Sequence, residues 1–189
     1  MTLRDVTRDA RVNLAAVNYH FGSKINLMRA VIQRRFEPIN AERLRRLNAA
    51  ILRGGGAPLP LEVIFEALFR PLFDEVKTAE GPDRTLIQMI GRALTEPADF
   101  IREMHKEFFF ELSRRFVSEL KRACPTIDED ELQLRFFLSV STMLGTITEQ
   151  VRLENMTAGK LGSTDLDRIC DGLTRFVVAG FRQAIPSTD

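Results

Sequence analysis

The sequence is poor in the residues that metal sites and disulfide frameworks need. It contains two cysteines, Cys124 and Cys170, without a CxxC pair, and only two histidines. Structural zinc sites take four ligands, mostly Cys and His at short spacings, and small disulfide-bonded domains need several cysteine pairs. We therefore expect no metal, no cofactor and no disulfide framework.

Long apolar runs and catalytic motifs are missing as well. No stretch approaches the roughly 18 apolar residues that span a bilayer, and the first five residues hold no apolar segment typical of a signal peptide. HExxH and GxSxG motifs are absent, and Gly54-Gly55-Gly56 lacks the Lys-Ser/Thr that completes a phosphate-binding loop. These absences favour a cytoplasmic protein with no membrane partner that is not an enzyme.

Strand signals are absent, whereas apolar residues recur at helical spacing along most of the chain. Pro38 predicts either a kinked helix or two abutting helices, and Thr164 predicts the N-cap of the last helix. The Gly-rich stretch at residues 54–58 predicts a linker. We expect an all-α protein with helices over residues 2–10, 14–21, 24–52, 60–78, 83–95, 97–122, 128–155 and 164–185.

The charge is distributed unevenly although the net charge is only +1. Residues 1–50 contain ten Lys/Arg and four Asp/Glu, which gives +6, and the remainder contains 17 and 22, which gives −5. A basic amino-terminal segment on an acidic body is typical of a protein whose first part binds a polyanion. A basic solvent-exposed helix face is the alternative.

The most informative stretch runs from Val12 to Lys24. Leu14, Val17 and Phe21 share one helix face, and the Gly-Ser pair that follows is suited to end this helix and start the next. With the preceding helix and a buried Val12 in the turn between them, the stretch predicts a helix-turn-helix. Small or hydrogen-bonding side chains cover the other faces of the second helix: Asn13, Ala15, Ala16, Asn18, Tyr19 and His20.

From Leu3 to Lys24, and on through Leu27 and Val31, the sequence resembles the DNA-binding half of the TetR family of transcriptional regulators. The resemblance is carried by the turn, by the helix ending in Tyr-His-Phe at residues 19–21, and by Lys-x-x-Leu at residues 24–27. It covers residues 2–36, and the later helices agree with the family in number and order. Within the family, the sequence around Asn13–Lys24 most resembles that of the fatty-acid-responsive repressors of the PsrA type.

Two departures from the family pattern concern the DNA-binding segment at the start of the chain. The family has a further helix before the one that begins here at Thr2, so we expect a DNA-binding domain that lacks its first helix. Arg11 stands where the family usually has Gly, which predicts a non-glycine residue in a left-handed turn.

The resemblance implies a helix-turn-helix DNA-binding domain at residues 1–36, N-terminally truncated, joined to a helical-bundle ligand-binding and dimerisation domain at residues 37–189. Asn13 and Asn18 would contact base edges, and Ala15 or Ala16 a thymine methyl group. The residues expected at phosphates are Thr2, Tyr19, His20 and Lys24. Three simpler interpretations stay open: Asn13 as an N-cap, His20 packed beside Phe21, and alanines that are small only for packing.

The resemblance also implies a homodimer on a double-stranded, palindromic DNA operator. Small residues interrupt the apolar stripes of the last two helices, which favours a dimer through these helices or close packing within one subunit. These residues are Ser139, Ser141, Gly145, Thr146, Gly172, Ala179 and Gly180. The Phe- and Met-rich body predicts a pocket for a small apolar, possibly fatty-acyl, effector, although such stripes also form ordinary cores. The predicted lining is Phe69, Phe73, Met89, Met104, Phe108, Phe136 and Met143.

The function that follows is a ligand-responsive transcriptional regulator, a repressor released from its operator by the effector. The alternative is a dimeric ligand-binding or interaction protein that has lost DNA binding.

Overall fold

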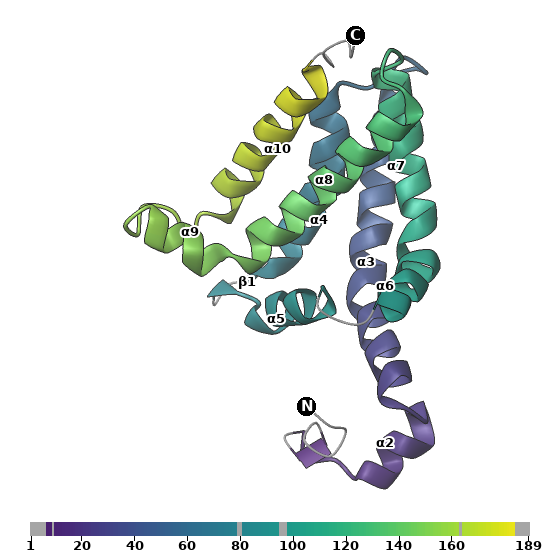
Figure 1. Cartoon of the computed structure of the whole chain (residues 1–189), viewed down its shortest axis with the longest axis vertical. Helices are drawn as coiled ribbons and strands as arrows, with labels where there is room; N and C mark the ends of the chain where they lie inside the picture. Colours follow the sequence, from purple (N-terminus) through teal and green to yellow (C-terminus); the bar gives the residue numbers. More distant parts are fainter. Residues whose placement is uncertain (1–6, 9, 79–80, 95–97, 163, 184–189) are drawn as a thin grey trace. The chain divides into compact units, whose positions relative to one another are not determined.

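The computed structural model describes residues 7–8, 10–78, 81–94, 98–162 and 164–183. The chain forms two compact units, Met1–Pro38 and Ile39–Asp189, which we call the head and the body. The boundary falls inside helix α3 (Lys24–Arg53), which contains Pro38 as a single helix (Figure 1). The alternative of two abutting helices at this proline is therefore wrong.

Beyond α3 the body is built almost entirely of helices, and the predicted all-α class is confirmed. The described residues also contain one antiparallel pair of two-residue strands, β1 (Lys77–Thr78) and β2 (Gly81–Pro82), which the sequence pattern did not predict. The helices of the body are α4 (Leu61–Val76), α5 (Arg84–Ala93), α6 (Ala98–Met104), the π-helical turn η1 (His105–Phe109), α7 (Phe110–Ala123), α8 (Glu129–Thr148), α9 (Gln150–Met156) and α10 (Leu166–Arg182).

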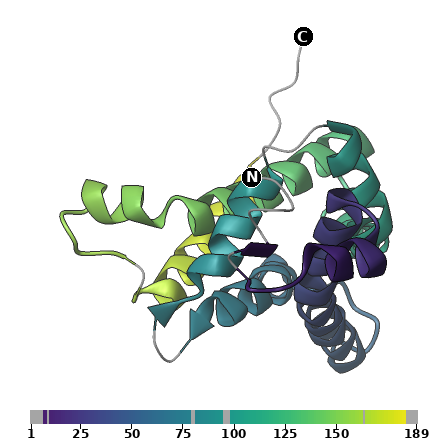
Figure 2. The same cartoon turned by 90° about the horizontal axis from the view of Figure 1, so that it is seen from below.

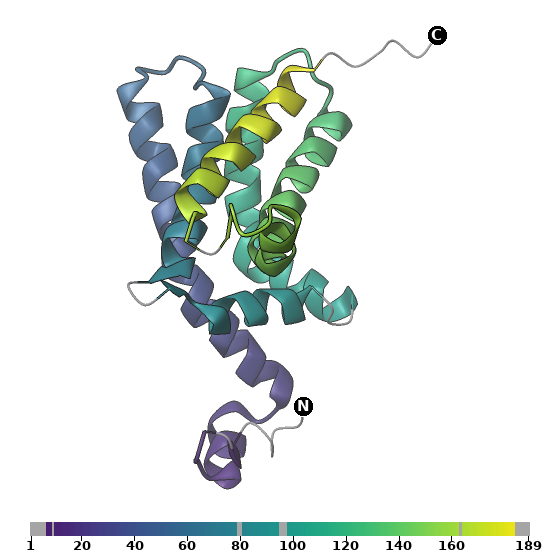
Figure 3. The ribbon, with the colours of Figure 1, turned by 90° about the vertical axis from the view of Figure 1, so that its left-hand side faces the viewer.

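Helix α4 lies at the centre of the body. Ten of its sixteen residues are buried, because α10 and α7 both pack against it (Figure 3). A helix that is apolar on most sides needs such neighbours to cover it. Phe65 of α4 stacks on Phe69, with ring centroids 5.4 Å apart, and meets Phe181 of α10 edge-on at 5.0 Å. The core of the body is therefore built around the aromatic side chains of α4.

Two helices begin where the sequence predicts, each after an aspartate that caps it. The carboxylate of Asp83 accepts the Leu86 N–H at 2.9 Å before α5, and that of Asp128 accepts the Glu131 N–H at 2.9 Å before α8. The predicted cap at Thr164 is wrong, because Asp165 precedes α10 and its carboxylate accepts the Gly162 N–H of the loop at 3.0 Å instead.

Two helices predicted as continuous are divided in the structure. The segment from residue 98 to 123 passes through η1 between α6 and α7. Residues 129–156 form α8 and α9, which meet at Glu149 and lead through a loop to α10 (Figure 2). Apolar periodicity predicts that these segments are helical but does not locate a break in the hydrogen-bonding ladder.

Candidate functional site

The turn before α2 places Arg11 in a left-handed conformation, with φ of 54°. The Val12 N–H donates to the Thr7 carbonyl at 3.0 Å, and the Arg11 N–H donates to the Arg8 carbonyl at 3.2 Å. These two bonds form a Schellman motif, the standard way to end a helix with one left-handed residue. The predicted non-glycine residue in a left-handed turn is thus present at Arg11.

Helix α2 is defined by side-chain and glycine caps at both ends. Asn13 Oδ1 accepts the Ala15 N–H at 2.8 Å, so the interpretation of Asn13 as the N-cap is confirmed. At the other end Gly22 has φ of 69°, and the Ser23 hydroxyl accepts the Asn26 N–H at 3.1 Å to start α3. The cap at Asn13 and the left-handed Gly22, both local features of the sequence, therefore set the bounds Leu14–Phe21.

The predicted DNA-contacting residues that the structure describes are all exposed: Asn13, Ala15, Ala16, Asn18, Tyr19, His20 and Lys24. Tyr19 is 86% exposed, and its ring meets that of His20 edge-on with centroids 5.3 Å apart. His20 is exposed rather than packed in a core, although its ring lies 6.5 Å from that of Phe21. Thr2 lies outside the described residues.

The apolar face of α2 is only half-buried. Leu14, Val17 and Phe21 are the least exposed residues of the helix, but none of them is fully buried. The expectation of a buried Val12 is wrong, because its side chain is 50% exposed. In the described part of the head the buried side chains are Thr7, Ile32 and Phe36, so no enclosed core surrounds Val12 there.

The predicted effector-contacting residues lie in the body and are mostly enclosed. Met89 and Phe108 are half-buried, and the other five are buried: Phe69, Phe73, Met104, Phe136 and Met143. The first two of these five lie on the central helix α4, and the last two on α8. Burial agrees both with a ligand pocket and with an ordinary core, so the pocket stays a prediction.

The sequence interpretation missed Arg43, whose side chain is only 3% exposed in the body. Its Nε donates to the Leu68 carbonyl of α4 at 2.7 Å, and its Nη2 contacts the sulfur of Met143 on α8 at 3.6 Å. Burial lowers the pKa of the guanidinium to about 10, which still leaves it protonated at neutral pH. A charged group therefore sits beside one of the residues expected to contact an effector.

A second polar residue on α3 links Arg43 to the π-helical turn. Arg43 Nη1 donates to Asn40 Oδ1 at 3.0 Å, and Asn40 Nδ2 donates to the Phe108 carbonyl at 3.0 Å. A π-helical turn leaves backbone groups out of the regular ladder and often marks a functional site. Asn40 and Arg43 thus connect α3 with α4, α8 and η1.

The helical repeat of α3 contains a pattern that predicts a buried Arg43. The buried positions of this helix recur at steps of three or four residues, and Arg43 occupies one of them. A charged residue at an otherwise apolar position of such a repeat indicates a buried charge. The buried positions are Ile32, Phe36, Ile39, Arg43, Leu47 and Ala50.

An open groove of about 520 Å³ lies over α3, α4 and α10 of the body. Its lining combines charged residues with small or aliphatic ones, and no Phe or Met side chain belongs to it: Arg45, Arg46, Ala49, Ala50, Arg53, Glu62, Val63, Glu66, Ala67 and Thr174. None of the seven predicted effector-contacting residues lines this groove.

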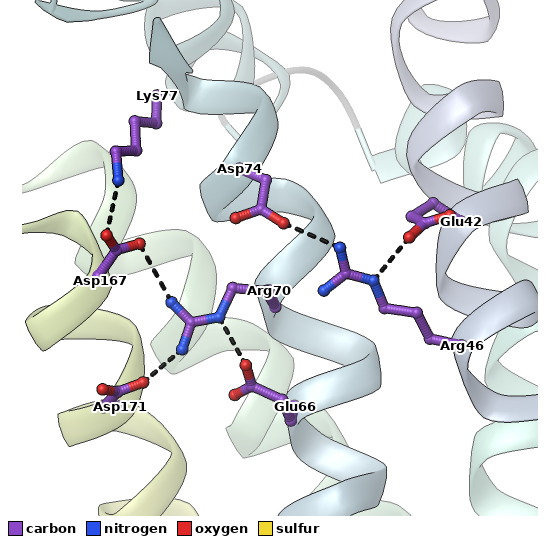
Figure 4. Close-up of polar contacts among 8 residues, drawn as sticks. All are labelled: Glu42, Arg46, Glu66, Arg70, Asp74, Lys77, Asp167 and Asp171. Atoms are coloured by element: carbon purple, nitrogen blue, oxygen red, sulfur yellow. Dashed lines mark hydrogen bonds and ion pairs between the residues drawn. The ribbon is translucent and has the colours of Figure 1, made fainter. Parts of the chain in front are cut away.

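Arg46 forms one ion pair within α3 and another that joins α3 to α4. Arg46 donates to Glu42 at 2.7 Å and to Asp74 of α4 at 2.9 Å (Figure 4). Hydrogen bonds from Arg45 and then Arg46 lower the pKa of Glu42 to about 2. The carboxylate of Glu42 therefore stays ionised far below neutral pH.

A second set of ion pairs joins α4 to α10. Arg70 donates to Glu66 at 2.6 Å, to Asp167 at 3.3 Å and to Asp171, and Lys77 contacts Asp167 at 2.6 Å (Figure 4). Arg70 is the half-buried member, whereas the surrounding carboxylates are more exposed. These contacts hold the central helix to the last helix by charge as well as by packing.

Exposed apolar side chains gather on the last two long helices. On α8, Leu134, Phe137 and Leu138 are 51%, 64% and 52% exposed, at spacings that put them on one helix face. On α10, which packs against α8, Phe176 is 70% exposed.

Of the small residues predicted to allow dimer contact, Ser139 is buried and its hydroxyl donates to the Arg135 carbonyl at 2.7 Å. Others, including Ser141, Ala179 and Gly180, are exposed.

Within the described ranges, no three His, Cys, Asp or Glu side chains are grouped as metal ligands. Along those same ranges no helix combines the length and apolar character needed to cross a bilayer.

The comparison with protein families identifies the body. Residues 66–180, more than half of the chain, match the family model described as "Tetracyclin repressor-like, C-terminal domain". No curated protein matches the chain. The family match lies outside residues 2–36, so it is independent of the motif in the head.

Proposed function

Because the chain belongs to the TetR family of ligand-responsive transcriptional regulators, we propose that it is a homodimeric repressor that binds a palindromic operator and is released by a small effector. The observation that carries this proposal is α2, a capped helix whose exposed faces bear amides, alanines, one tyrosine and one histidine, without a carboxylate. The family's regulators are generally not enzymes, and we place this one in the cytoplasm.

In this proposal α2 enters the major groove of DNA. Asn18 would hydrogen-bond a base edge, since an amide can pair with adenine through two bonds, and Ala15 or Ala16 would contact a thymine methyl group. Asn13 caps the helix through its oxygen, which leaves its amide nitrogen as the group for DNA. Thr2, Tyr19, His20 and Lys24 would bind phosphates and fix the position of the helix without reading the sequence.

The proposed dimer forms through α8 and α10. The exposed side chains of Leu134, Phe137, Leu138 and Phe176 are large apolar groups on two neighbouring helices, which is typical of the central part of a protein interface. A dimer places two α2 helices on the two halves of a palindrome, and this multiplies the affinity of a single short helix for DNA.

The effector site is proposed in the body, among the buried Phe and Met side chains of α4 and α8. Met side chains adapt their shape readily, so such a core can open around an apolar ligand. We further propose that the protein belongs with the fatty-acid-responsive repressors of the PsrA type. An effector would act by favouring a dimer conformation in which the two α2 helices no longer match the operator spacing.

DNA binding is tested by fluorescence anisotropy of the purified chain on duplexes that tile the DNA upstream of its gene. We expect one palindromic segment to bind at least about a thousandfold more tightly than scrambled duplex. The logarithm of its association constant should fall linearly with the logarithm of salt concentration. Asn18→Ala should weaken binding to this segment by about tenfold, because a base contact is worth 1–3 kcal/mol.

Asn155→Ala is the matched control, since Asn155 is an exposed asparagine on α9, outside the head. It should leave the affinity for the operator unchanged. If every duplex binds equally weakly, the proposal fails and the alternative of a dimeric ligand-binding or interaction protein takes its place.

A further inference from the structure

Arg43 is unlike three other arginines of the body that are partly enclosed by protein. Arg46, Arg70 and Arg135 are half-buried, and each pairs with a carboxylate at 2.6 or 2.7 Å. Arg43 is more deeply buried than any of these, yet no carboxylate among the described residues pairs with it. Burying an unneutralised cation is expensive, so this position calls for a physical reason.

The groups that do contact Arg43 are neutral acceptors. They are the Leu68 carbonyl at 2.7 Å, the Asn40 side-chain oxygen at 3.0 Å and the thioether of Met143 at 3.6 Å. The thioether is a weak acceptor. A guanidinium has five N–H groups, so two remain without an acceptor within the part of the chain that the structure describes.

A purely structural role explains these contacts less well. A neutral side chain of similar size could join α3, α4 and α8 without the cost of an isolated charge, and replacing buried ionic groups by apolar ones is often neutral or stabilising. What a neutral side chain cannot do is bind an anion. The guanidinium fork matches a carboxylate with two parallel hydrogen bonds.

We propose that Arg43 is the anchor for the negatively charged group of the effector, and that this group is a single carboxylate on an otherwise apolar molecule. The carboxylate takes the place of the Met143 sulfur at Nη2 and accepts from the guanidinium. Met143 is flexible enough to move aside and cover the apolar part of the ligand. This inference rests on the proposed role of the body as the effector-binding domain.

The surroundings of Arg43 select the charge and the shape of the ligand. One cation neutralises one negative charge, so a monocarboxylate fits and a dianion would remain partly uncompensated. Of the residues that contact this cation, Leu68 of α4 and Met143 of α8 are buried apolar residues. The effector therefore combines one ionised end with an apolar body.

The test compares carboxylates with uncharged ligands of the same shape. The probes are straight-chain fatty acids from hexanoate to tetradecanoate, each with the primary alcohol of equal length, and benzoate with benzyl alcohol. Isothermal titration calorimetry and thermal unfolding of the full chain measure binding below the critical micelle concentrations. For at least one pair, the carboxylate should bind wild type about tenfold or more tightly than the alcohol.

Arg43→Met should abolish this preference, so that acid and alcohol of one length bind equally. Arg43→Gln, which keeps a neutral donor for the Leu68 carbonyl, should do the same and serves if the Met variant does not fold. Arg45→Met removes an exposed arginine two positions along the same helix and should keep the preference. Met143→Leu removes the competing sulfur and should keep or increase it.

Two results would overturn the inference. One is a wild-type protein for which no carboxylate binds more tightly than its alcohol, and the other is a preference that persists in a folded Arg43 variant. Operator affinity without ligand is measured in parallel. A protein that binds operator but shows no carboxylate preference disproves the anchor alone, whereas a carboxylate preference without operator binding disproves the proposed function and leaves the anchor intact.

Discussion

Arg11 shows how a single residue can hold a conformation that it does not favour. Its φ of 54° would suit glycine, because a Cβ atom crowds the backbone in the left-handed region. The Schellman bonds of the flanking backbone keep Arg11 there. The turn that leads into α2 is therefore specified by its hydrogen bonds in spite of the residue at its centre.

Arg11→Gly should stabilise the protein by about 0.5–1 kcal/mol, because the relief of strain exceeds the extra entropy of glycine in the unfolded chain. Ala158→Gly should act in the same direction, since Ala158 has φ of 51°. Urea unfolding followed by helical circular dichroism measures both changes. The control Ala41→Gly, at an exposed position within α3, should instead destabilise by about 1 kcal/mol. A loss of stability in Arg11→Gly would contradict the strain argument.

Arg43 and Val12 mark the limits of sequence reasoning at the scale of single residues. Helical periodicity counts apolar residues, so it does not single out a charged residue at a buried position. Val12 was expected to be buried because an aliphatic residue stands in the turn, but side-chain burial depends on which elements surround it. Both outcomes are set by tertiary packing, which the local pattern does not contain.

At the scale of elements, the agreement with sequence is best where the signal is local. The bounds of α2 and the starts of α5 and α8 follow from Asn13, Gly22, Asp83 and Asp128, which act within three residues of the helix end. The π-helical turn η1 was not predicted, because apolar periodicity does not show where the hydrogen-bonding ladder changes. Its Phe108 carbonyl accepts from the Asn40 side chain, which lies 68 positions away in the chain. A local sequence pattern does not contain contacts between residues so far apart.

The ion pairs of Glu42 within α3 make the stability of the body depend on acid pH. The pKa of Glu42 is lowered from 4.5 to about 2 in the folded protein by the hydrogen bonds of Arg45 and Arg46. A lowered folded-state pKa gives stability that is fully present above pH 4.5 and is lost as the pH falls from 4.5 toward 2. The effect is reduced by solvent screening, since the Glu42 side chain is 32% exposed.

Glu42→Gln should therefore be less stable than wild type at neutral pH, and the difference should shrink as the pH falls from 4.5 toward 2. Urea unfolding at a series of pH values measures this difference. Glu154→Gln on α9 is the control. Its free energy of unfolding should change with pH as that of wild type does, because no arginine contact to Glu154 is present among the described residues. A Glu42→Gln curve that stays parallel to wild type would show that these hydrogen bonds do not stabilise the fold.

At the scale of the whole molecule, the two halves of the chain support one family from separate observations. The sequence of residues 2–36 resembles the family's DNA-binding half, and residues 66–180 match the C-terminal domain model. The unequal charge fits the same division, with excess positive charge in the first fifty residues. The proposed regulator needs both parts, because a body that senses a ligand controls transcription only through a head that binds DNA.

The proposed dimer makes a prediction that separates assembly from folding. Phe137 is 64% exposed in the single chain, so Phe137→Glu should leave the fold and the thermal unfolding of the body intact. In a dimer through α8 and α10 the same change buries a charge among apolar groups, and the dissociation constant should rise by about thirtyfold or more. Phe176→Glu, on α10, should have a similar effect.

Sedimentation velocity over a range of protein concentrations measures the dimer directly. Leu52→Glu is the matched control, since Leu52 is a large apolar residue on α3 that is 82% exposed, and it should remain as dimeric as wild type. The monomeric variants should also lose most of their affinity for a palindromic operator. They should retain binding to the carboxylate probes, because the proposed ligand contacts lie within one body. If both Phe variants dimerise as wild type does, the interface lies elsewhere on the molecule.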